Sequence, residues 1–425
     1  MTRHPVFALS DRFVDDYAAR SPLAATTRGI EGHDHELDDR SPAGIEALAD
    51  LLRRTRDELA ALPEGSDRDA RLAVRVLDAF TRDELGLIER GDHRRDLSHL
   101  ASAVAAVRET IDGQDRSSPA AWAAVAARLK GMDRFLAGWR ESLAEGLATG
   151  DVVAARQVRS VIRQLRTSVE PAGTYSLVVA EHVGGDDALA AELHEGLAVT
   201  RAANVAAAEW LEQEYLPAAS SEDGVGRERY ALEAAYHVGR DLDLDETYAW
   251  AWGVIGELRT RMVAVAGDLD PDADLHEVVA RLKTDPSAAA ATQADFAAAM
   301  LDRQHRALEL LAGRHVDVPV EIRDVEVRLA APGSPLGAWY RSPSEDLSRP
   351  GQIWWSLGSK APVPLWEEVS TAYHEGFPGH HLQVALALTM GDRLSRVHRL
   401  LYWKPGTGEG WALYAERLMD ELGFL

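Results

Sequence analysis

Apolar residues recur at helical spacing along most of this 425-residue chain, and this pattern limits its fold more than any other feature. Ile45, Leu48, Leu52, Leu59 and Leu62, for example, share one face of a helix. The sequence therefore predicts a mainly α-helical protein. Further amphipathic runs of this kind cover residues 67–90, 97–111, 119–148, 152–169, 189–216, 246–265 and 296–311.

One region interrupts the helical pattern. Val325–Leu329 alternates apolar and polar residues, as a half-buried strand does, and Ala338–Tyr340 and Gln352–Ser356 are rich in β-prone residues. We expect a small sheet of two or three strands here, and helix again from about Leu365. This sheet directly precedes the most informative residues of the chain.

The composition excludes several kinds of site and partner. Because the chain has no cysteine, it has no thiolate zinc site, iron–sulfur cluster or cysteine nucleophile, so a transition-metal site must use His, Asp and Glu. The net charge of −23 argues against nucleic acid or an anionic membrane as a partner. No apolar run is long enough for a membrane span, and residues 1–7 lack the apolar core of a secretory signal. We therefore expect a cytoplasmic protein.

Three histidines lie close together in the segment from His374 to His381. The usual zinc-peptidase pattern, H-E-x-x-H, places two imidazoles at i and i+4 on one face of a helix. Here His374 and Glu375 match the first two positions of this pattern, but the residue four positions after His374 is Pro378, which cannot bind a metal. The second ligand must therefore be His380 or His381.

A straight helix would not bring either histidine to His374. His380 would point about 120° away, and His381 would lie about 10 Å along the axis. Pro378, however, has no N–H to donate to the His374 carbonyl, and its ring clashes with that carbonyl, so the helix must open there. Gly376 and Gly379 permit an unusual turn at this point. Such a turn can return a downstream imidazole to the face of His374. The sequence leaves both histidines open, and we favour His380 because Gly379 precedes it, as a glycine often precedes the second ligand of the usual pattern.

A catalytic zinc ion needs a third protein ligand from a neighbouring element. Glu409 lies between two glycines near the start of a later helix, where an acid is also favoured by the helix dipole alone. Glu416, two turns onward, is the alternative ligand or a residue that supports one. Glu375 is the expected general base because it adjoins His374. The sequence thus predicts one zinc ion per chain.

The segments 374–383 and 409–416 resemble a bacterial family of largely uncharacterised proteins. That family is grouped with the gluzincin zinc metallopeptidases, beside neurolysin-like oligopeptidases, angiotensin-converting enzyme and Taq-type carboxypeptidases. The resemblance extends upstream to residues 340–351, 38–41 and 25–30, and so covers nearly the whole chain.

The resemblance implies a large helical bundle with a central cleft, like that of neurolysin or angiotensin-converting enzyme, and a small β-sheet next to the active-site helix. Residues 1–320 would form the cleft walls, and residues 321–425 the sheet and the metal-binding helices. The resemblance also implies that an edge strand, 352–357, pairs with the main chain of a substrate. The expected substrate-binding residues are Gln352, Ile353, Trp354 and Trp355.

The function implied by the resemblance is zinc-dependent hydrolysis of short peptides, with Glu375 as the base. Family members usually continue beyond the position of Leu425, so we expect a truncated chain without the Tyr or His that stabilises the oxyanion in related peptidases. Two alternatives stay open: a non-catalytic helical binding protein with a structural metal site, and a metal-dependent hydrolase of an ester or non-peptide amide. A structural site would not need Glu375. The sequence does not indicate an oligomeric state.

Overall fold

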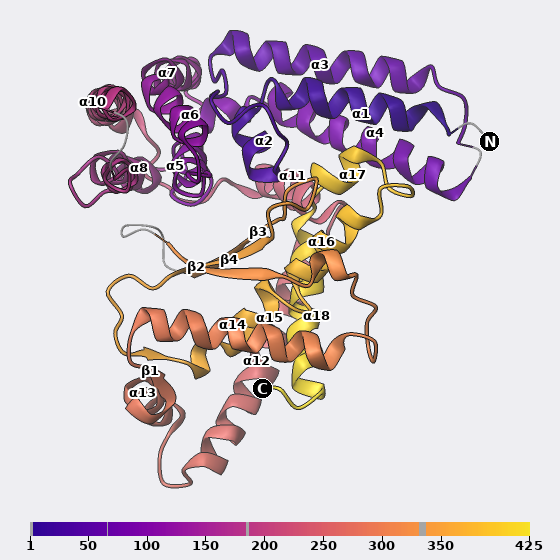
Figure 1. Cartoon of the computed structure of the whole chain (residues 1–425), viewed down its shortest axis with the longest axis vertical. Helices are drawn as coiled ribbons and strands as arrows, with labels where there is room; N and C mark the ends of the chain where they lie inside the picture. Colours follow the sequence, from indigo (N-terminus) through magenta and orange to yellow (C-terminus); the bar gives the residue numbers. More distant parts are fainter. Residues whose placement is uncertain (1–2, 66, 184–186, 331–336) are drawn as a thin grey trace.

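The computed structural model describes residues 3–65, 67–183, 187–330 and 337–425. The protein is mainly α-helical with two small sheets, which confirms the predicted fold class. A layer of N-terminal helices lies across one end of the molecule, and the larger sheet and the C-terminal helices lie beneath it (Figure 1). Among the described residues, no helix has the length and apolarity needed to cross a membrane.

The N-terminal layer consists of helices, with longer connections at residues 29–41 and 90–102. The helices are α1 (Pro5–Ala18), α2 (Pro22–Arg28), α3 (Pro42–Ala60), α4 (Arg68–Glu89), α5 (Ala103–Asp112), α6 (Pro119–Lys130), α7 (Met132–Thr149), α8 (Ala155–Thr167), α9 (Thr174–Ala180) and α10 (Asp187–Trp210). A π-helical turn, Leu211–Tyr215, continues α10.

The second part of the chain contains the remaining helices and all the strands. The helices are α11 (Arg227–Val238), α12 (Leu244–Leu269), α13 (Leu275–Thr284), α14 (Gln293–Leu311), α15 (Val369–Glu375), α16 (His380–Thr389), α17 (Arg396–Leu400) and α18 (Pro405–Glu421). The strands are β1 (Ala289–Ala290), β2 (Val325–Leu329), β3 (Gly337–Arg341), β4 (Gly351–Ser356) and β5 (Val363–Pro364).

Two predicted helices have different limits in the structure. The run 97–111 is helical only from Ala103, because the Ser102 side chain accepts the Ala105 amide and caps the helix there. The run 119–148 is divided at Gly131, whose amide bonds to the carbonyls of both Ala127 and Arg128 and closes α6. Apolar periodicity continues across this break, so the pattern alone does not reveal it.

Three hydrophobic clusters hold the molecule together. One lies among α5 to α10, and a second joins α1, α3 and α4 to Leu388 and to α17. The third contains α14, the sheet, α15 and α16, and extends from Ala290 to Met419. The second cluster thus fastens the C-terminal helices to the N-terminal layer. The division at residue 320 stays a prediction, although α14, which precedes it, packs with the sheet.

The larger sheet has the strand order β2-β4-β3. β4 pairs in parallel with β2, with Ile353 opposite Val327, and antiparallel with β3, with Trp354 opposite Trp339. The prediction that 352–357 is an edge strand was therefore wrong. Both sides of β4 are occupied by neighbouring strands, so the main chain of Gln352, Ile353, Trp354 and Trp355 is not free to pair with a peptide.

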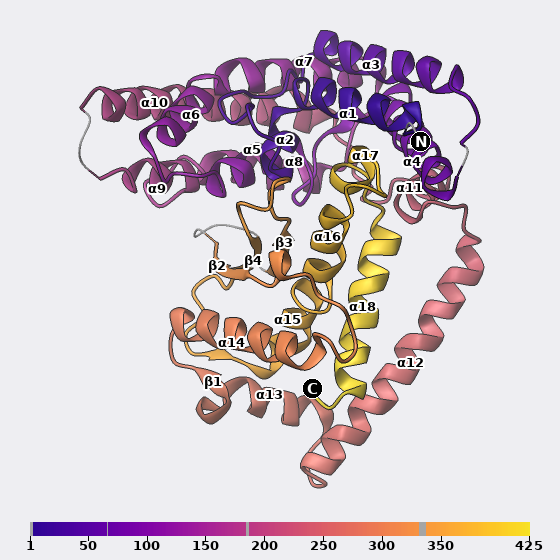
Figure 2. The same ribbon diagram turned by 45° about the vertical axis from the view of Figure 1, so that its right-hand side comes forward.

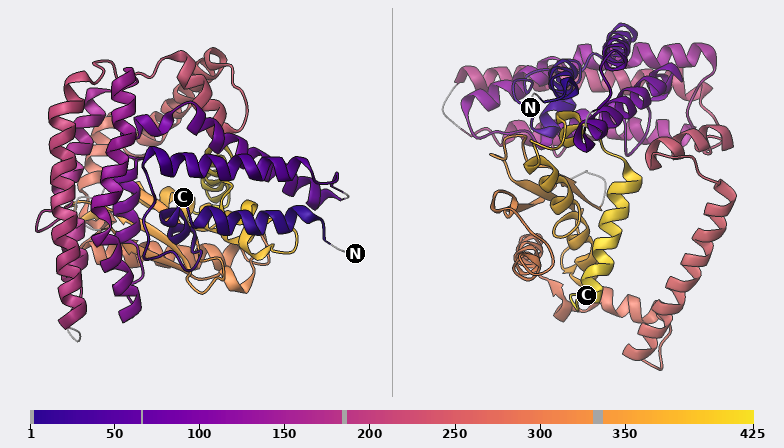
Figure 3. Two further views of the ribbon diagram at one scale, coloured as in Figure 1. Left: turned by 90° about the horizontal axis from the view of Figure 1, so that it is seen from above. Right: turned by 90° about the vertical axis from the view of Figure 1, so that its right-hand side faces the viewer.

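Helix α12 stands apart from the rest of the molecule. It links α11 to α13 along one side, with a gap between its ribbon and that of α18 (Figure 2; Figure 3, right). Ala266 is the one buried residue of this fully described helix, and Trp250 and Trp252 are exposed. Seen from above, the N-terminal helices lie over the sheet and the C-terminal helices (Figure 3, left).

Candidate metal centre

The histidine segment forms two helices separated by a sharp turn. α15 ends at Glu375 and α16 begins at His380, and Pro378 lies in the turn between them. The Gly379 amide donates to the Tyr373 carbonyl, which folds α16 back against the end of α15. The ring centroids of His374 and His380 are 4.8 Å apart as a result. The predicted break at Pro378 is confirmed.

Two glycines make this turn possible. A Cβ at Gly379 would lie 1.9 Å from the carbonyl oxygen of His374, and a Cβ at Gly376 would lie 1.9 Å from Oε1 of Gln304. Gln304, a buried residue of α14, donates to the Ala372 carbonyl and accepts the Phe377 amide. Its side chain therefore supplies the Phe377 amide with an acceptor at the break in the helix, and it adds a second donor to the Ala372 carbonyl, which also accepts the Gly376 amide.

The predicted ligands His374, His380 and Glu409 come together at this turn. Their ligand atoms all lie within 4.8 Å of one another. Nε2 of His374 is 3.1 Å from Oε2 of Glu409, and Nε2 of His380 is 3.6 Å from the same oxygen. Trp411 holds α18 in place, because its indole N–H donates to the carbonyls of Pro378 and Gly379. Within the described part of the chain, no other group of three potential ligands is this close.

The two adjacent histidines, His380 and His381, have different contacts in the structure. Nε2 of His381 lies 2.8 Å from the Ile322 carbonyl, and its Nδ1 lies 2.9 Å from the Tyr340 hydroxyl. His381 is fully buried and both its nitrogens are engaged, so neither is directed at Glu409. His380 instead has a buried Nδ1 without a hydrogen-bond partner among the described residues, and its Nε2 faces Glu409. The preference for His380 agrees with this arrangement.

Glu416 supports the site rather than completing it. Its Oε1 lies 2.8 Å from Nδ1 of His374, which leaves Nε2 of His374 directed at Glu409. A carboxylate on the second nitrogen of a ligating histidine fixes the orientation of the ring. This hydrogen bond is also the main reason that the pKa of His374 is raised.

The two other titratable groups of the turn are shifted by burial. Burial lowers the pKa of His380 to about 4, so this imidazole is neutral at pH 7, the form that binds a metal. Burial raises the pKa of Glu375 to about 7, with His374 opposing the shift. A carboxylate with such a pKa can both accept and release a proton near neutral pH.

The donor set fits a zinc ion. Two imidazole nitrogens and one carboxylate oxygen converge from three helices, which is the His₂Glu set of catalytic zinc sites that keep one position for water. The carboxylate of Glu416 gives His374 the supporting contact that a ligating histidine usually has. No thiol competes for the metal, because the chain has no cysteine.

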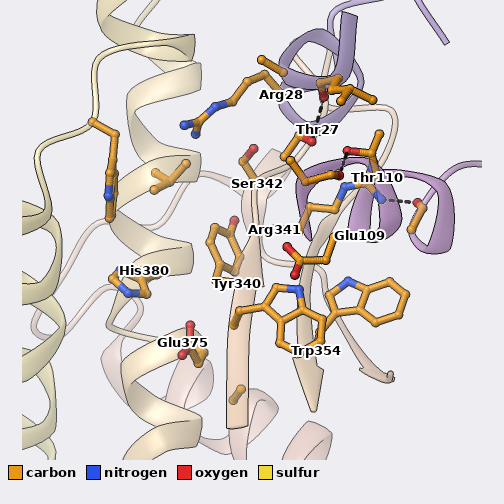
Figure 4. A pocket seen from close by; sticks show the side chains of 18 of the residues that line it. Thr27, Arg28, Glu109, Thr110, Tyr340, Arg341, Ser342, Trp354, Glu375 and His380 are labelled. Atoms are coloured by element: carbon orange, nitrogen blue, oxygen red, sulfur yellow. Dashed lines mark hydrogen bonds between the residues drawn. The ribbon is translucent and has the colours of Figure 1, made fainter. Parts of the chain in front are cut away.

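The cluster lies in a cavity of about 740 Å³ between the two layers of the molecule. β3 and the histidine turn form its lower wall, and α2 and α5 form its upper wall (Figure 4). The indoles of Trp339 and Trp354 stack nearly parallel, with centroids 6.1 Å apart, and both line the cavity. Of the predicted substrate-binding residues, Trp354 reaches this space.

Sequence reasoning missed several residues of the site. Tyr340 holds His381, Gln304 supports the turn, and Arg28 enters the cavity from α2. Gln304 lies far from the histidines in sequence, and no local pattern marks it. Tyr340 lies in the predicted sheet, and both Tyr340 and Arg28 lie in segments of the resemblance, but the sequence assigns neither a role in the site.

Comparison with known proteins places the chain in a family. Residues 22–425 match the model of the family described as "Bacterial protein of unknown function (DUF885)". The chain belongs to this family. No curated protein matches the sequence.

Two solved structures share the fold. The first, described as a "putative lipoprotein" from Colwellia psychrerythraea, has a TM-score of 0.80 at 18% identity, over 98% of this chain and 78% of that chain. The second, described as a "putative lipoprotein of unknown function" from Shewanella oneidensis, has a TM-score of 0.64 at 16% identity, over 98% of this chain and 78% of that chain. At these identities the likeness concerns the fold alone.

Proposed function

We propose that this protein is a zinc-dependent hydrolase that cleaves short peptides, and that it belongs with the gluzincin metallopeptidases. The observation that carries the proposal is the convergence of His374, His380 and Glu409, with the buried Glu375 lining the same cavity. His374, His380 and Glu409 would hold one zinc ion. Bound there, zinc would polarise the scissile carbonyl and lower the pKa of a water molecule.

Glu375 acts as the base in this proposal. Its carboxylate accepts a proton from the attacking water, whose oxygen forms the new bond to the carbonyl carbon. The protonated Glu375 then donates that proton to the amine nitrogen as the C–N bond breaks. Because burial raises its pKa to about 7, the group is suited to both steps. Its burial also limits competition from bulk water.

An extended peptide can be aligned along β3. Among the described strands, β3 is an edge of the larger sheet, and it pairs with β4 on its other side. Ala338, Trp339, Tyr340 and Arg341 of this strand line the cavity. Main-chain pairing with β3 would present a peptide carbonyl to the histidine turn.

Zinc analysis together with a peptide digestion tests the proposal. We expect about one zinc ion per purified chain, and cleavage of a mixed peptide library that is detected by mass spectrometry. Glu375→Gln should keep the zinc and lose at least about a hundredfold in rate, as loss of a general base does.

Two results would count against the proposal. Cleavage by Glu375→Gln at the parental rate would exclude Glu375 as the base. Zinc binding with no cleavage of any library peptide would favour a binding protein, or a hydrolase of another bond, which an ester and amide panel would then identify.

A further inference from the structure

Arg28, the last residue of α2, is an unusual charge in the upper wall of the cavity. It lines the same space as Glu375 and His380, and its side chain extends into that space from α2 (Figure 4). Its guanidinium makes no hydrogen bond or ion pair with any residue that the structure describes. The phenol of Tyr17 is the one titratable group that acts on it appreciably.

Two arginines of neighbouring elements, Arg341 of β3 and Arg108 of α5, have partners. The Arg341 guanidinium donates to the carbonyls of Gly113 and Thr26, and Arg108 pairs with Glu109 at 3.0 Å. A guanidinium that is partly buried without a counter-ion retains a cost of desolvation. In a chain with a net charge of −23, a lone cation facing the cavity is best explained by an anion that arrives with the substrate.

The scaffold that carries Arg28 is firmly held. The Thr26 hydroxyl donates to Asp34 at 2.6 Å and accepts a bond from Arg128. The Leu23 amide donates to Asp38 at 3.0 Å. These bonds fix both ends of α2, so Arg28 is presented from a rigid element, which favours a binding role.

We propose that Arg28 binds the C-terminal carboxylate of the peptide whose scissile bond lies at the histidine turn. This inference rests on the proposed function and makes the protein an enzyme that cleaves close to a free C-terminus. A guanidinium matches a carboxylate in shape and charge. Glu109 and Asp38 also line the cavity, and they would repel a dianion such as a phosphate more strongly than a singly charged carboxylate.

A carboxylate can come from a peptide C-terminus or from an acidic side chain, and three peptides distinguish the two. They are acetyl-tetraalanine as the free acid, its C-terminal amide, and acetyl-Ala-Ala-Glu-Ala amide. Their binding is measured by calorimetry on the zinc-loaded full chain carrying Glu375→Gln, which prevents turnover. We expect the free acid to bind about ten- to a hundredfold more tightly than either amide, as one charged hydrogen-bonded contact allows.

Variants of Arg28 test whether this side chain is responsible. Arg28→Gln should bind the free acid and the amide equally, and Arg28→Lys should keep part of the preference because it keeps the charge. Because Arg28 makes no hydrogen bond with a described residue, both variants should fold, and thermal melting checks this. Arg54→Gln is the matched control, because Arg54 is exposed on α3 and also has no ion-pair partner in the described chain.

Three outcomes would overturn the proposal. The first is equal binding of free acid and amide by the parent protein. The second is a preference that persists in Arg28→Gln, because the carboxylate would then be bound elsewhere, for example by the metal. The third is tight, Arg28-dependent binding of the Glu-containing amide, which would assign the site to an acidic side chain. Binding does not require cleavage, so these outcomes are distinct from a failure of the hydrolase proposal.

Discussion

The two walls of the cavity differ in how they are built and in what they contain. The lower wall places two histidines and two glutamates, all within residues 374–409, on α15, α16 and α18, around a turn that depends on glycine. The upper wall is formed by α2 and α5, from near the other end of the chain, and contributes Arg28 and Glu109. We infer that the lower wall performs the chemistry and the upper wall recognises the substrate. Variants of the lower wall should therefore change metal binding, and variants of the upper wall should not.

The largest expected effect is at the glycine of the turn. In Gly379→Ala the new Cβ would lie 1.9 Å from the His374 carbonyl oxygen, so the turn must open. We expect the free energy of unfolding to fall by about 3 kcal/mol or more, and zinc binding to be lost. Chemical denaturation and zinc analysis measure the two effects.

Gly86→Ala is the control for this variant. Gly86 lies within α4, and a Cβ there would meet nothing within 4 Å. This variant should gain about 0.5–1 kcal/mol, because alanine favours a helix, and should keep its zinc. A Gly379→Ala protein with parental stability and zinc content would show that the turn does not form the site.

A smaller effect, confined to stability, is expected at Arg128 of α6, which supports the upper wall through its contacts with the segment around α2. Arg128 is fully buried, and burial lowers its pKa to about 10. Its guanidinium joins α6 to the segment around α2. The acceptors are the carbonyls of Glu36, Pro22 and His33 and the side chains of Gln114 and Thr26.

Arg128→Met removes these bonds and leaves buried acceptors without partners. We expect a loss of about 2–3 kcal/mol in the free energy of unfolding, measured by denaturant titration. Zinc content should stay at the parental value, because Arg128 contacts no residue of the histidine turn. Loss of zinc in a folded Arg128→Met protein would show that the two walls are not independent, and would contradict their separate roles.

The same contrast explains what could be predicted from the sequence. His374 and His380 could be predicted because a proline four residues after His374 has a local effect on a helix. Glu409 could be predicted because it lies between two glycines near the start of a later helix. The choice between His380 and His381 needed the structure, since it depends on contacts with Tyr340 and Ile322, which belong to other elements.

The sheet shows a different limit. β-prone residues correctly indicated a strand at 351–356, but strand order depends on which segments pair with it. Because β2 and β3 both pair with β4, this strand is the central strand of the sheet and not the expected edge strand. Arg28 lies within segment 25–30 of the resemblance, but the sequence assigns it no role, since its significance lies in a cavity formed by distant parts of the chain and in the absence of a partner among the described residues.

A zinc titration of metal-free protein tests the metal centre most directly. Three forms are compared: the parent chain, His380→Ala and His381→Ala. The parent should bind one zinc ion per chain, and His381→Ala should bind one as well, although it loses about 1–3 kcal/mol of stability because the Ile322 carbonyl and the Tyr340 hydroxyl are left without a partner. His380→Ala should lose at least about a hundredfold in zinc affinity. Parental affinity in His380→Ala, or a parent chain that binds no zinc, would contradict the site described for this fold.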